Sequence, residues 1–127
     1  MIKKFAEKNS DYFYFVFRVL IGLLFLLHGI MKIPMIQQGK LPLMGLMGLA
    51  MIIEVLGGAM IILGLFTRYV ASISAIEMIA AFFIAHYPKG INPLANGGES
   101  AVLFFAAFLV LIVFGSRKFA LDKGFKK

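Results

Sequence analysis

The sequence predicts an all-α integral membrane protein, a four-helix bundle with both termini in the cytoplasm. The chain of 127 residues is 61% hydrophobic and has a mean hydropathy of +0.95, whereas soluble domains are closer to half apolar. A single domain of this length cannot bury so much apolar surface in a core that faces water. The apolar residues form continuous runs and do not alternate with polar ones, which favours membrane-spanning helices over a barrel.

Four apolar runs are long enough, the last only marginally, to cross about 30 Å of hydrocarbon as helices. We expect the spans at about residues 13–33, 43–66, 69–87 and 100–115, all in one domain that covers 1–127. Pro34, Pro42 and Pro88 mark span boundaries, because proline disfavours a continuing helix. Arg68 lies in a turn so short that the second and third spans form a tight hairpin. The segment from Pro88 to Glu99 is rich in proline and glycine, which predicts a structured or mobile loop.

The basic residues outside the spans predict the orientation, since lysine and arginine concentrate in cytoplasmic loops. Most of them flank one side of the predicted bundle: Lys3, Lys4, Lys8, Arg68, Arg117, Lys118, Lys123, Lys126 and Lys127. Lys32, Lys40 and Lys89 fall on the other side, so both termini are expected to be cytoplasmic. The net charge of +7 therefore suits topology and anionic lipid. Nucleic acid is not an expected partner, because no basic-aromatic stripe or groove-reading motif is present.

Several kinds of chemistry are excluded by what the sequence lacks. The chain has no cysteine, which excludes disulfide exchange and thiolate metal sites within it. It also contains no phosphate-binding loop, dinucleotide-binding fingerprint, nucleophile elbow or HExxH motif. The candidates for function are therefore the polar residues inside the apolar runs.

Arg18, Glu54 and Glu77 each lie within a predicted span, where a charge costs about 3 kcal/mol on insertion scales. At helical rise, Arg18 and Glu77 lie about 8 and 12 Å from one membrane surface, and Glu54 lies near the midplane. We expect Arg18 to pair with Glu54, Glu77 or both in a buried charge network. One arginine cannot neutralise two glutamates, so the surplus carboxyl should keep a proton and can carry protons or bond a carbonyl ligand. The alternative, that this ion pair only joins three helices and has no chemical function, is left open.

Helix periodicity predicts which faces turn inward. The first span repeats polar and small residues at intervals of four and three: Arg18, Gly22, Phe25, Gly29 and Lys32. Gly57-Gly58 follow Glu54 by about one turn, and Ala80-Ala81 follow Glu77 in the same way. Close contact between helices in lipid favours such small residues, so we expect these faces, with their charges, to point into the bundle.

A second polar group is expected at the outer mouth of the bundle, where four residues are ligand-binding candidates: His28, Lys32, His86 and Glu99. Two histidines and a carboxylate can bind zinc or iron, but these lie on three helices with no closely spaced pair, so we expect no metal. A quinone or another flat apolar ligand, with its carbonyl held by histidine or glutamate, also fits. The alternative is that the histidines are interfacial residues and that the helix dipole alone favours Glu99.

Three stretches of the sequence resemble the DoxX family. They are Arg18 with Gly22-Leu23-Leu24-Phe25, His28-Gly29 and Lys32; Glu54 with Gly57-Gly58 and the turn Leu63-Gly64-Leu65-Phe66-Thr67-Arg68; and Asn96-Gly97-Gly98-Glu99. The family's C-terminal pattern is partly kept, as Gly115 and Leu121-Asp122. Matched position by position, Arg18, Lys32, Glu54, Arg68 and Glu99 follow the family's polar pattern.

The resemblance implies a four-span protein of the bacterial plasma (inner) membrane. Some DoxX members are linked to quinone-coupled oxidation of sulfur compounds, others to oxidative-stress complexes or to responses to catechols and quinones. We therefore expect a small subunit or accessory of a quinone-linked oxidoreductase or oxidative-stress system, with lipid and a redox protein as partners and quinone as its ligand. A non-catalytic scaffold and a small proton or solute permease remain alternatives. Whether the chain is an enzyme or forms a homo-oligomer is left open.

Overall fold

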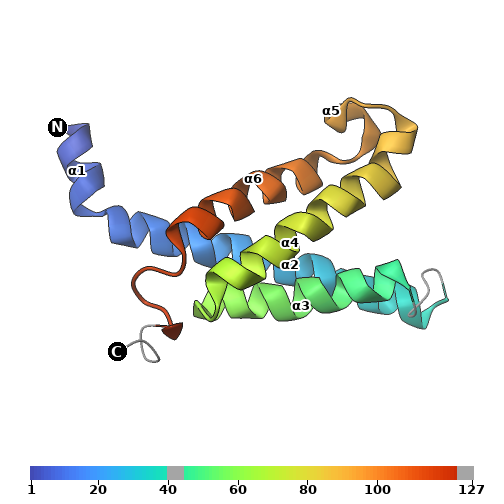
Figure 1. Cartoon of the computed structure of the whole chain (residues 1–127), viewed down its shortest axis with the longest axis horizontal. Helices are drawn as coiled ribbons and strands as arrows, with labels where there is room; N and C mark the ends of the chain where they lie inside the picture. The colour runs from blue at the N-terminus through green and yellow to red at the C-terminus, as the bar shows by residue number, and fades with distance from the viewer. Residues whose placement is uncertain (40–44, 123–127) are drawn as a thin grey trace.

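The structure, a computed structural model, describes residues 1–39 and 45–122 and is helical without strands in these ranges, so the all-α prediction is confirmed. The elements are α1 (Ile2–Lys8), α2 (Ser10–Gln37), α3 (Leu46–Leu63), α4 (Thr67–Ala81), α5 (Pro93–Asn96) and α6 (Glu99–Phe114) (Figure 1). Between α4 and α5, a π-helical turn η1 (Phe82–His86) leads into a 3-10 turn η2 (Tyr87–Lys89). The short helices α1 and α5 are additions to the predicted elements.

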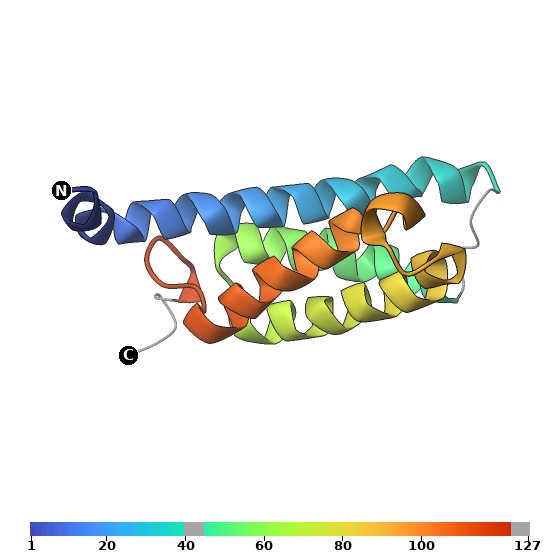
Figure 2. The same ribbon diagram turned by 90° about the horizontal axis from the view of Figure 1, so that it is seen from above.

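The four long helices form two packed pairs. α2 packs against α3, α4 packs against α6, and the α3–α4 hairpin joins the pairs (Figures 1 and 2). The N-terminus, the α3–α4 turn and the segment between α6 and Asp122 lie at one end of the bundle, here called the terminal end. The end of α2, the start of α3 and α5 lie at the opposite end, here called the loop end.

The helices are apolar enough for a membrane. Within the described residues, α2, α3 and the continuous stretch Thr67–Lys89 are long and apolar enough to span a bilayer, and α6 is a shorter apolar helix. Their outward faces expose large apolar side chains such as Leu20, Ile73 and Leu103, which water would not tolerate over so large an area. The prediction of several spans is therefore confirmed, although α6 is shorter than the other three.

Two predicted boundaries are wrong. Pro34 does not end the first span, because α2 continues to Gln37. The Gln38 N–H donates to the Pro34 carbonyl at 2.9 Å and so closes the turn that follows the proline. In the second span, α3 ends at Leu63 and not at residue 66, since the next residue, Gly64, has a left-handed φ of 71°.

The remaining spans differ less from the prediction. α4 begins at Thr67, two residues early, and helical structure continues past Tyr87 to Lys89. The predicted start of the second span lies outside the described residues, together with several boundary and basic residues: Lys40, Pro42, Leu43, Lys123, Lys126 and Lys127.

The α2–α3 interface depends on glycine. The predicted inner face of α2 is confirmed, with Gly22 among its buried residues. Gly22 faces Gly58 of α3 so closely that a Cβ at position 58 would lie 2.7 Å from the Gly22 carbonyl oxygen and 2.5 Å from the Leu26 nitrogen. These neighbours are backbone atoms that cannot rotate away, so the two helices need glycine here.

The inner face of α4 differs from the prediction. The buried residues are Ala71, Ser74, Ala75 and Met78, along with Thr67. Ala80 is exposed, so its predicted place on the inner face is wrong, whereas Ala81 is half-buried and lines a cavity inside the bundle. The core between the helix pairs contains three stacked or edge-on aromatic rings, Phe25, Phe104 and Phe108, whose centroids lie 4.8 to 5.9 Å apart.

The close approach of α2 and α3 makes a testable prediction. Gly58→Ala should destabilise the protein by about 1–3 kcal/mol, because the added methyl meets fixed backbone. Gly57→Ala is the matched control, since a Cβ there would meet only side-chain atoms at 3.4 Å or more. The measurement is the free energy of unfolding of both variants in a lipid-detergent mixture. Equal losses for the two variants would contradict the interpretation.

Candidate functional site

Arg18 does not pair with the glutamates. The side chain is fully buried, at 0% exposure, and its guanidinium donates five hydrogen bonds that all go to backbone carbonyls. Nε donates to Ile61 O at 3.0 Å and Nη2 to Ile62 O at 3.2 Å. Both carbonyls lie in the last turn of α3. Carbonyls in a last turn lack the N–H partner that a following helical turn would supply, and their partial negative charge attracts a cation. The predicted network of Arg18 with Glu54 and Glu77 is therefore wrong.

The other Arg18 bonds hold the segment that follows α6. Nη1 donates to Ser116 O at 2.7 Å and to Lys118 O at 3.2 Å, and Nη2 donates to Phe119 O at 2.8 Å. A guanidinium carries five N–H donors, so the number of bonds equals the number of donors. Arg18 therefore connects α2, the end of α3 and the C-terminal segment at the terminal end.

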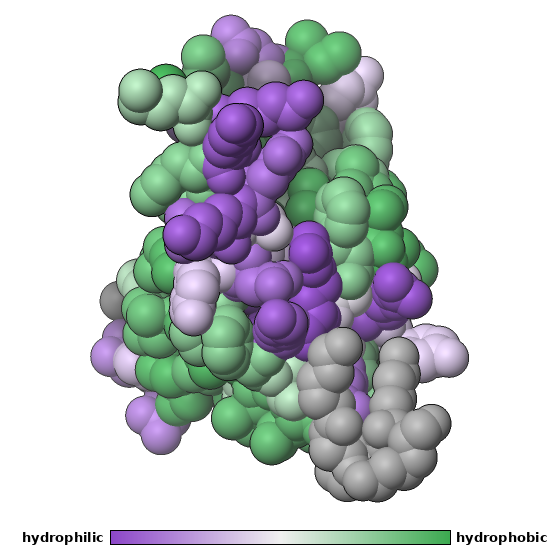
Figure 3. Space-filling view, turned by 90° about the vertical axis from the view of Figure 1, so that its left-hand side faces the viewer, coloured by the Kyte–Doolittle hydropathy of each residue, from purple (hydrophilic) through white to green (hydrophobic). Residues whose placement is uncertain are grey.

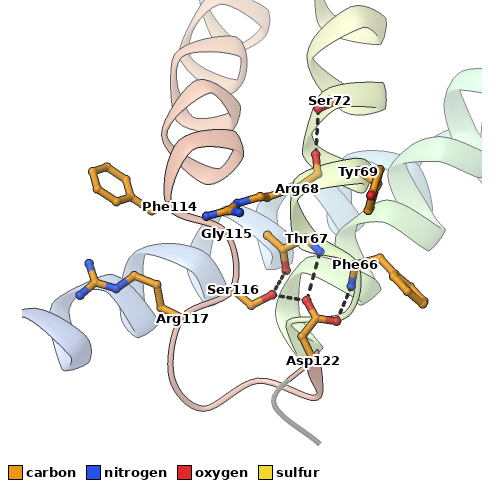
Figure 4. A pocket seen from close by; sticks show the side chains of 10 residues that line it. All are labelled: Phe66, Thr67, Arg68, Tyr69, Ser72, Phe114, Gly115, Ser116, Arg117 and Asp122. Carbon is orange, nitrogen blue, oxygen red and sulfur yellow. Dashed lines mark hydrogen bonds between the residues drawn. The ribbon is translucent and has the colours of Figure 1, made fainter. Parts of the chain in front are cut away.

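Asp122 binds the backbone N–H groups at the start of α4 (Figure 4). Its Oδ1 accepts from the Phe66 N–H at 2.8 Å, and its Oδ2 lies 3.5 Å from the Thr67 nitrogen. The Ser116 hydroxyl lies 2.5 Å from Oδ2 and 2.6 Å from the Thr67 hydroxyl. A carboxylate at a helix N-terminus is favoured by the free N–H groups and by the helix dipole. The α3–α4 turn is thus stabilised at one helix end by Arg18 and at the other by Asp122.

At the loop end, Lys32 forms the ion pair with Glu54 that the sequence analysis expected of Arg18. Its Nζ lies 2.6 Å from Glu54 Oε1, and the two side chains are only 18% and 4% exposed. The pair joins α2 to α3 one turn beyond Gly29, where the backbones are in contact: a Cβ at Gly29 would lie 2.8 Å from the Val55 nitrogen. The charge of Glu54 is therefore balanced within the bundle by the lysine at the end of the same predicted face.

Glu77 of α4 brings a second carboxyl to this ion pair. Its carboxyl lies close enough to Glu54 and Lys32 to interact electrostatically with both. Glu77 Oε1 is buried and finds no hydrogen-bond donor among the described residues. Two carboxyl groups can bond to each other only through a proton. A cluster of Lys32, Glu54 and Glu77 is consequently neutral when one of its carboxyls is protonated.

A cavity of about 270 Å³ opens beside this cluster, where the long helices converge on the loop. Its lining includes four polar residues that the sequence singled out: His28, Lys32, Glu54 and His86. Phe25 and Phe104 supply an aromatic wall, and their rings lie 5.3 Å apart. Its lining thus combines aromatic surface with convergent polar groups, and both are found in sites for small molecules.

His86 reaches the cavity through the π-helical turn η1. On a continuous α-helix, His86 would lie half a turn away from Glu77, but a π turn contains one more residue and rotates the positions that follow it. His86 Nδ1 lies 3.2 Å from the Asn96 carbonyl oxygen. Because a carbonyl only accepts, Nδ1 is the donor in this bond, and Nε2 is not used by it.

The loop that bonds His86 is itself ordered by Asn96. The Asn96 side chain is buried, donates to Gly90 O at 2.7 Å and accepts from the Gly98 N–H at 2.8 Å. A Cβ at Gly98 would lie 2.8 Å from the Phe82 ring. The Asn-Gly-Gly sequence therefore lets the loop close against η1 and fixes the His86 side of the cavity.

The predicted outer mouth is only partly assembled. His28 lines the cavity and lies edge-on to Phe104 at 5.2 Å. Glu99, the first residue of α6, is exposed and does not line the cavity. The next residue, Ser100, lines it instead. The described residues contain no group of three or more His, Asp or Glu side chains that could hold a metal ion.

Together these features define a helical membrane protein that neutralises its charges inside the bundle and keeps a polar cavity at one end. The DoxX family model matches residues 13–87, and the chain belongs to this family, which confirms the resemblance of its motifs. An uncharacterised protein of Haemophilus influenzae is 37% identical over 129 aligned positions, which cover 95% of this chain and 96% of that protein. No solved structure matches the chain.

The sequence missed the cluster at the terminal end. Thr67, Ser116 and Asp122 were not singled out as a group, although Leu121-Asp122 belongs to the partly kept C-terminal family pattern. The family model ends at residue 87, before two of these three positions. The spacing of Asp122 from Thr67 along the chain carried no signal that they meet.

Arg18 allows a sharp test of the terminal end. Arg18→Lys keeps the positive charge but replaces a five-donor fork by one nitrogen, which cannot reach all the carbonyls. We expect a loss of about 2–4 kcal/mol in unfolding free energy and faster proteolysis after residue 115. Arg117→Lys is the control, since its ion pair with Asp11 is partly exposed and contributes little. Wild-type stability of Arg18→Lys would contradict this role.

Proposed function

We propose that the protein is a small accessory subunit of a quinone-linked oxidoreductase or oxidative-stress system in the bacterial plasma (inner) membrane. In this proposal, the loop-end cavity holds the ring of a quinone or of a similar flat carbonyl compound. The observation that carries it is the buried Lys32–Glu54 ion pair in the lining of an aromatic-walled cavity, with the Glu77 carboxyl near the pair but outside the lining. Family membership supports the proposal, since some DoxX members are linked to quinone chemistry.

The cavity suits a single ring. Its volume of about 270 Å³ lies just below the usual range for ligand pockets, about 300–1,000 Å³, which favours a ring over a long molecule. Phe25 and Phe104 offer aromatic surface to a flat ligand. Lys32, which lines the cavity beside Glu54, can donate to a carbonyl oxygen of the ligand. Ser100 of α6 also lines the cavity.

The charged cluster supplies protons. Reduction of a quinone to a quinol consumes two electrons and two protons. We assign the electrons to a partner oxidoreductase and both protons to the cluster. The cluster holds one proton on its two carboxyls, releases it to the quinone and is reloaded from the aqueous side before the second transfer. Lys32 keeps the pair from accumulating negative charge in a poorly solvated site.

The orientation is part of the proposal. The terminal end carries the described basic residues Lys3, Lys4, Lys8, Arg68 and Arg117, and basic residues favour the cytoplasmic side. We therefore place both termini in the cytoplasm and the cavity toward the opposite leaflet.

One observation favours a second candidate, a small proton or solute permease. Ser74 Oγ is buried and, like Glu77 Oε1, has no hydrogen-bond partner among the described residues. Ser74 lies one turn from Glu77 on α4, in the direction of the terminal end. These two atoms extend the polar cluster away from the cavity, as a proton path across the bundle would require.

Quinone binding tests the proposal. In lipid nanodiscs, a short-chain ubiquinone analogue should bind the wild type. Glu54→Gln and Lys32→Met, which change residues of the cavity lining, should each weaken binding about tenfold, the loss of one charge-assisted hydrogen bond. Infrared difference spectra of the bound and free protein should show a protonated carboxyl band that disappears in Glu77→Gln.

Glu99→Gln is the matched control, because Glu99 carries the same group but lies outside the cavity. Its affinity and its spectrum should equal those of the wild type. If the wild type binds no quinone analogue, or if Glu99→Gln weakens binding as much as Glu54→Gln, the quinone proposal fails. Proton flux into liposomes that depends on Glu54 but not on quinone would instead support the permease.

A further inference from the structure

A second, larger cavity of about 650 Å³ lies at the terminal end, outside the site proposed for quinone. It is bounded by the α3–α4 turn, the first turns of α4 and the segment after α6 (Figure 4). Two guanidinium groups line it, those of Arg68 and Arg117. We propose that this cavity binds the phosphate group of an anionic phospholipid.

Arg68 is held across one edge of the cavity. Its Nη2 donates to the Val113 carbonyl at 3.1 Å, which uses one of the five N–H groups of the guanidinium. Gly115, with a φ of +69°, lies directly beneath the side chain, and a Cβ there would be 2.9 Å from Arg68 Nε. The glycine thus provides the space in which the guanidinium lies flat against the end of α6.

Arg117 comes from the segment after α6. Its guanidinium lies 5.4 Å from the ring centroid of Tyr14 and 6.0 Å from that of Phe114, and it pairs with Asp11 at 3.2 Å. Both side chains of this pair are about one-third exposed, and such ion pairs are weak. The aromatic rings therefore position the cation while its charge stays accessible to a stronger anion.

Asp122 also lines the cavity, and its carboxylate is bound at the start of α4. It accepts from the Phe66 and Thr67 N–H groups at the start of α4 and contacts the Ser116 hydroxyl. Its charge is stabilised by the N-terminus of that helix. The opposite side of the cavity is therefore cationic and suited to phosphate.

The surroundings favour a phosphate that is attached to a lipid. Phe66, Tyr69 and Phe114 line the cavity and are exposed on the bundle surface, as aromatic residues at the border of the hydrocarbon are. Figure 3 looks onto the terminal end and shows hydrophilic side chains across it with apolar side chains around them. A phospholipid can place its acyl chains on the apolar surface and its phosphate between the arginines, which chelate phosphate through paired N–H groups.

Native mass spectrometry of the full-length chain tests this site. The protein is exchanged into nanodiscs of phosphatidylglycerol and phosphatidylcholine with the same acyl chains, and the lipid retained after release is counted. The wild type should retain phosphatidylglycerol preferentially, and Arg68→Gln and Arg117→Gln should each reduce its retention about fivefold.

Lys118→Gln is the control, because it removes the same charge at the same end from a side chain outside the cavity. It should retain phosphatidylglycerol as the wild type does, and thermal unfolding of all variants shows that they are folded. An equal loss in Lys118→Gln, or equal retention of phosphatidylcholine, would overturn the proposal. Displacement of the lipid by inorganic phosphate alone would overturn the assignment to lipid, because the acyl chains would then add nothing.

Discussion

Polar groups within the hydrocarbon region of a membrane must find their partners inside the protein, because no water is there to bond them. This constraint explains why the polar groups of this bundle gather at its two ends. Arg18 meets backbone carbonyls at the terminal end, and Lys32 meets carboxyls at the loop end. Between these sites the core is mainly apolar, with Phe25 and Phe108 fully buried, although the buried Ser74 hydroxyl of α4 also lies there.

The two cations are not interchangeable. The last carbonyls of α3 and those of the segment after α6 lie in several directions around one point, and only a guanidinium has enough donors to bond them all. The loop end needs a compact charge beside one carboxylate, and the Lys32 ammonium lies 2.6 Å from Glu54. Each end therefore uses the cation whose geometry matches its acceptors.

The sequence predicted the parts that depend on composition and helix period. The apolar runs, the inner face of α2 through Gly22 and Gly29, and the family were all readable. The partner of Arg18 was not, because a helical rise gives depth but neither the direction of a side chain nor the position of backbone carbonyls from other segments. The position of His86 in the cavity lining could not be predicted either, because the π-helical turn η1 departs from the 3.6-residue helical period that the prediction assumed.

The central claim is that Lys32 and Glu54 form a buried ion pair that keeps the cavity cluster neutral. A double-mutant cycle of Lys32→Met and Glu54→Gln, measured as unfolding free energy in lipid, tests it most directly. Each single change should leave an unbalanced buried charge and destabilise the protein, while the double variant should recover part of the loss, with a coupling energy of about 2 kcal/mol or more. Losses that simply add would show that the two side chains do not depend on each other and would contradict the account.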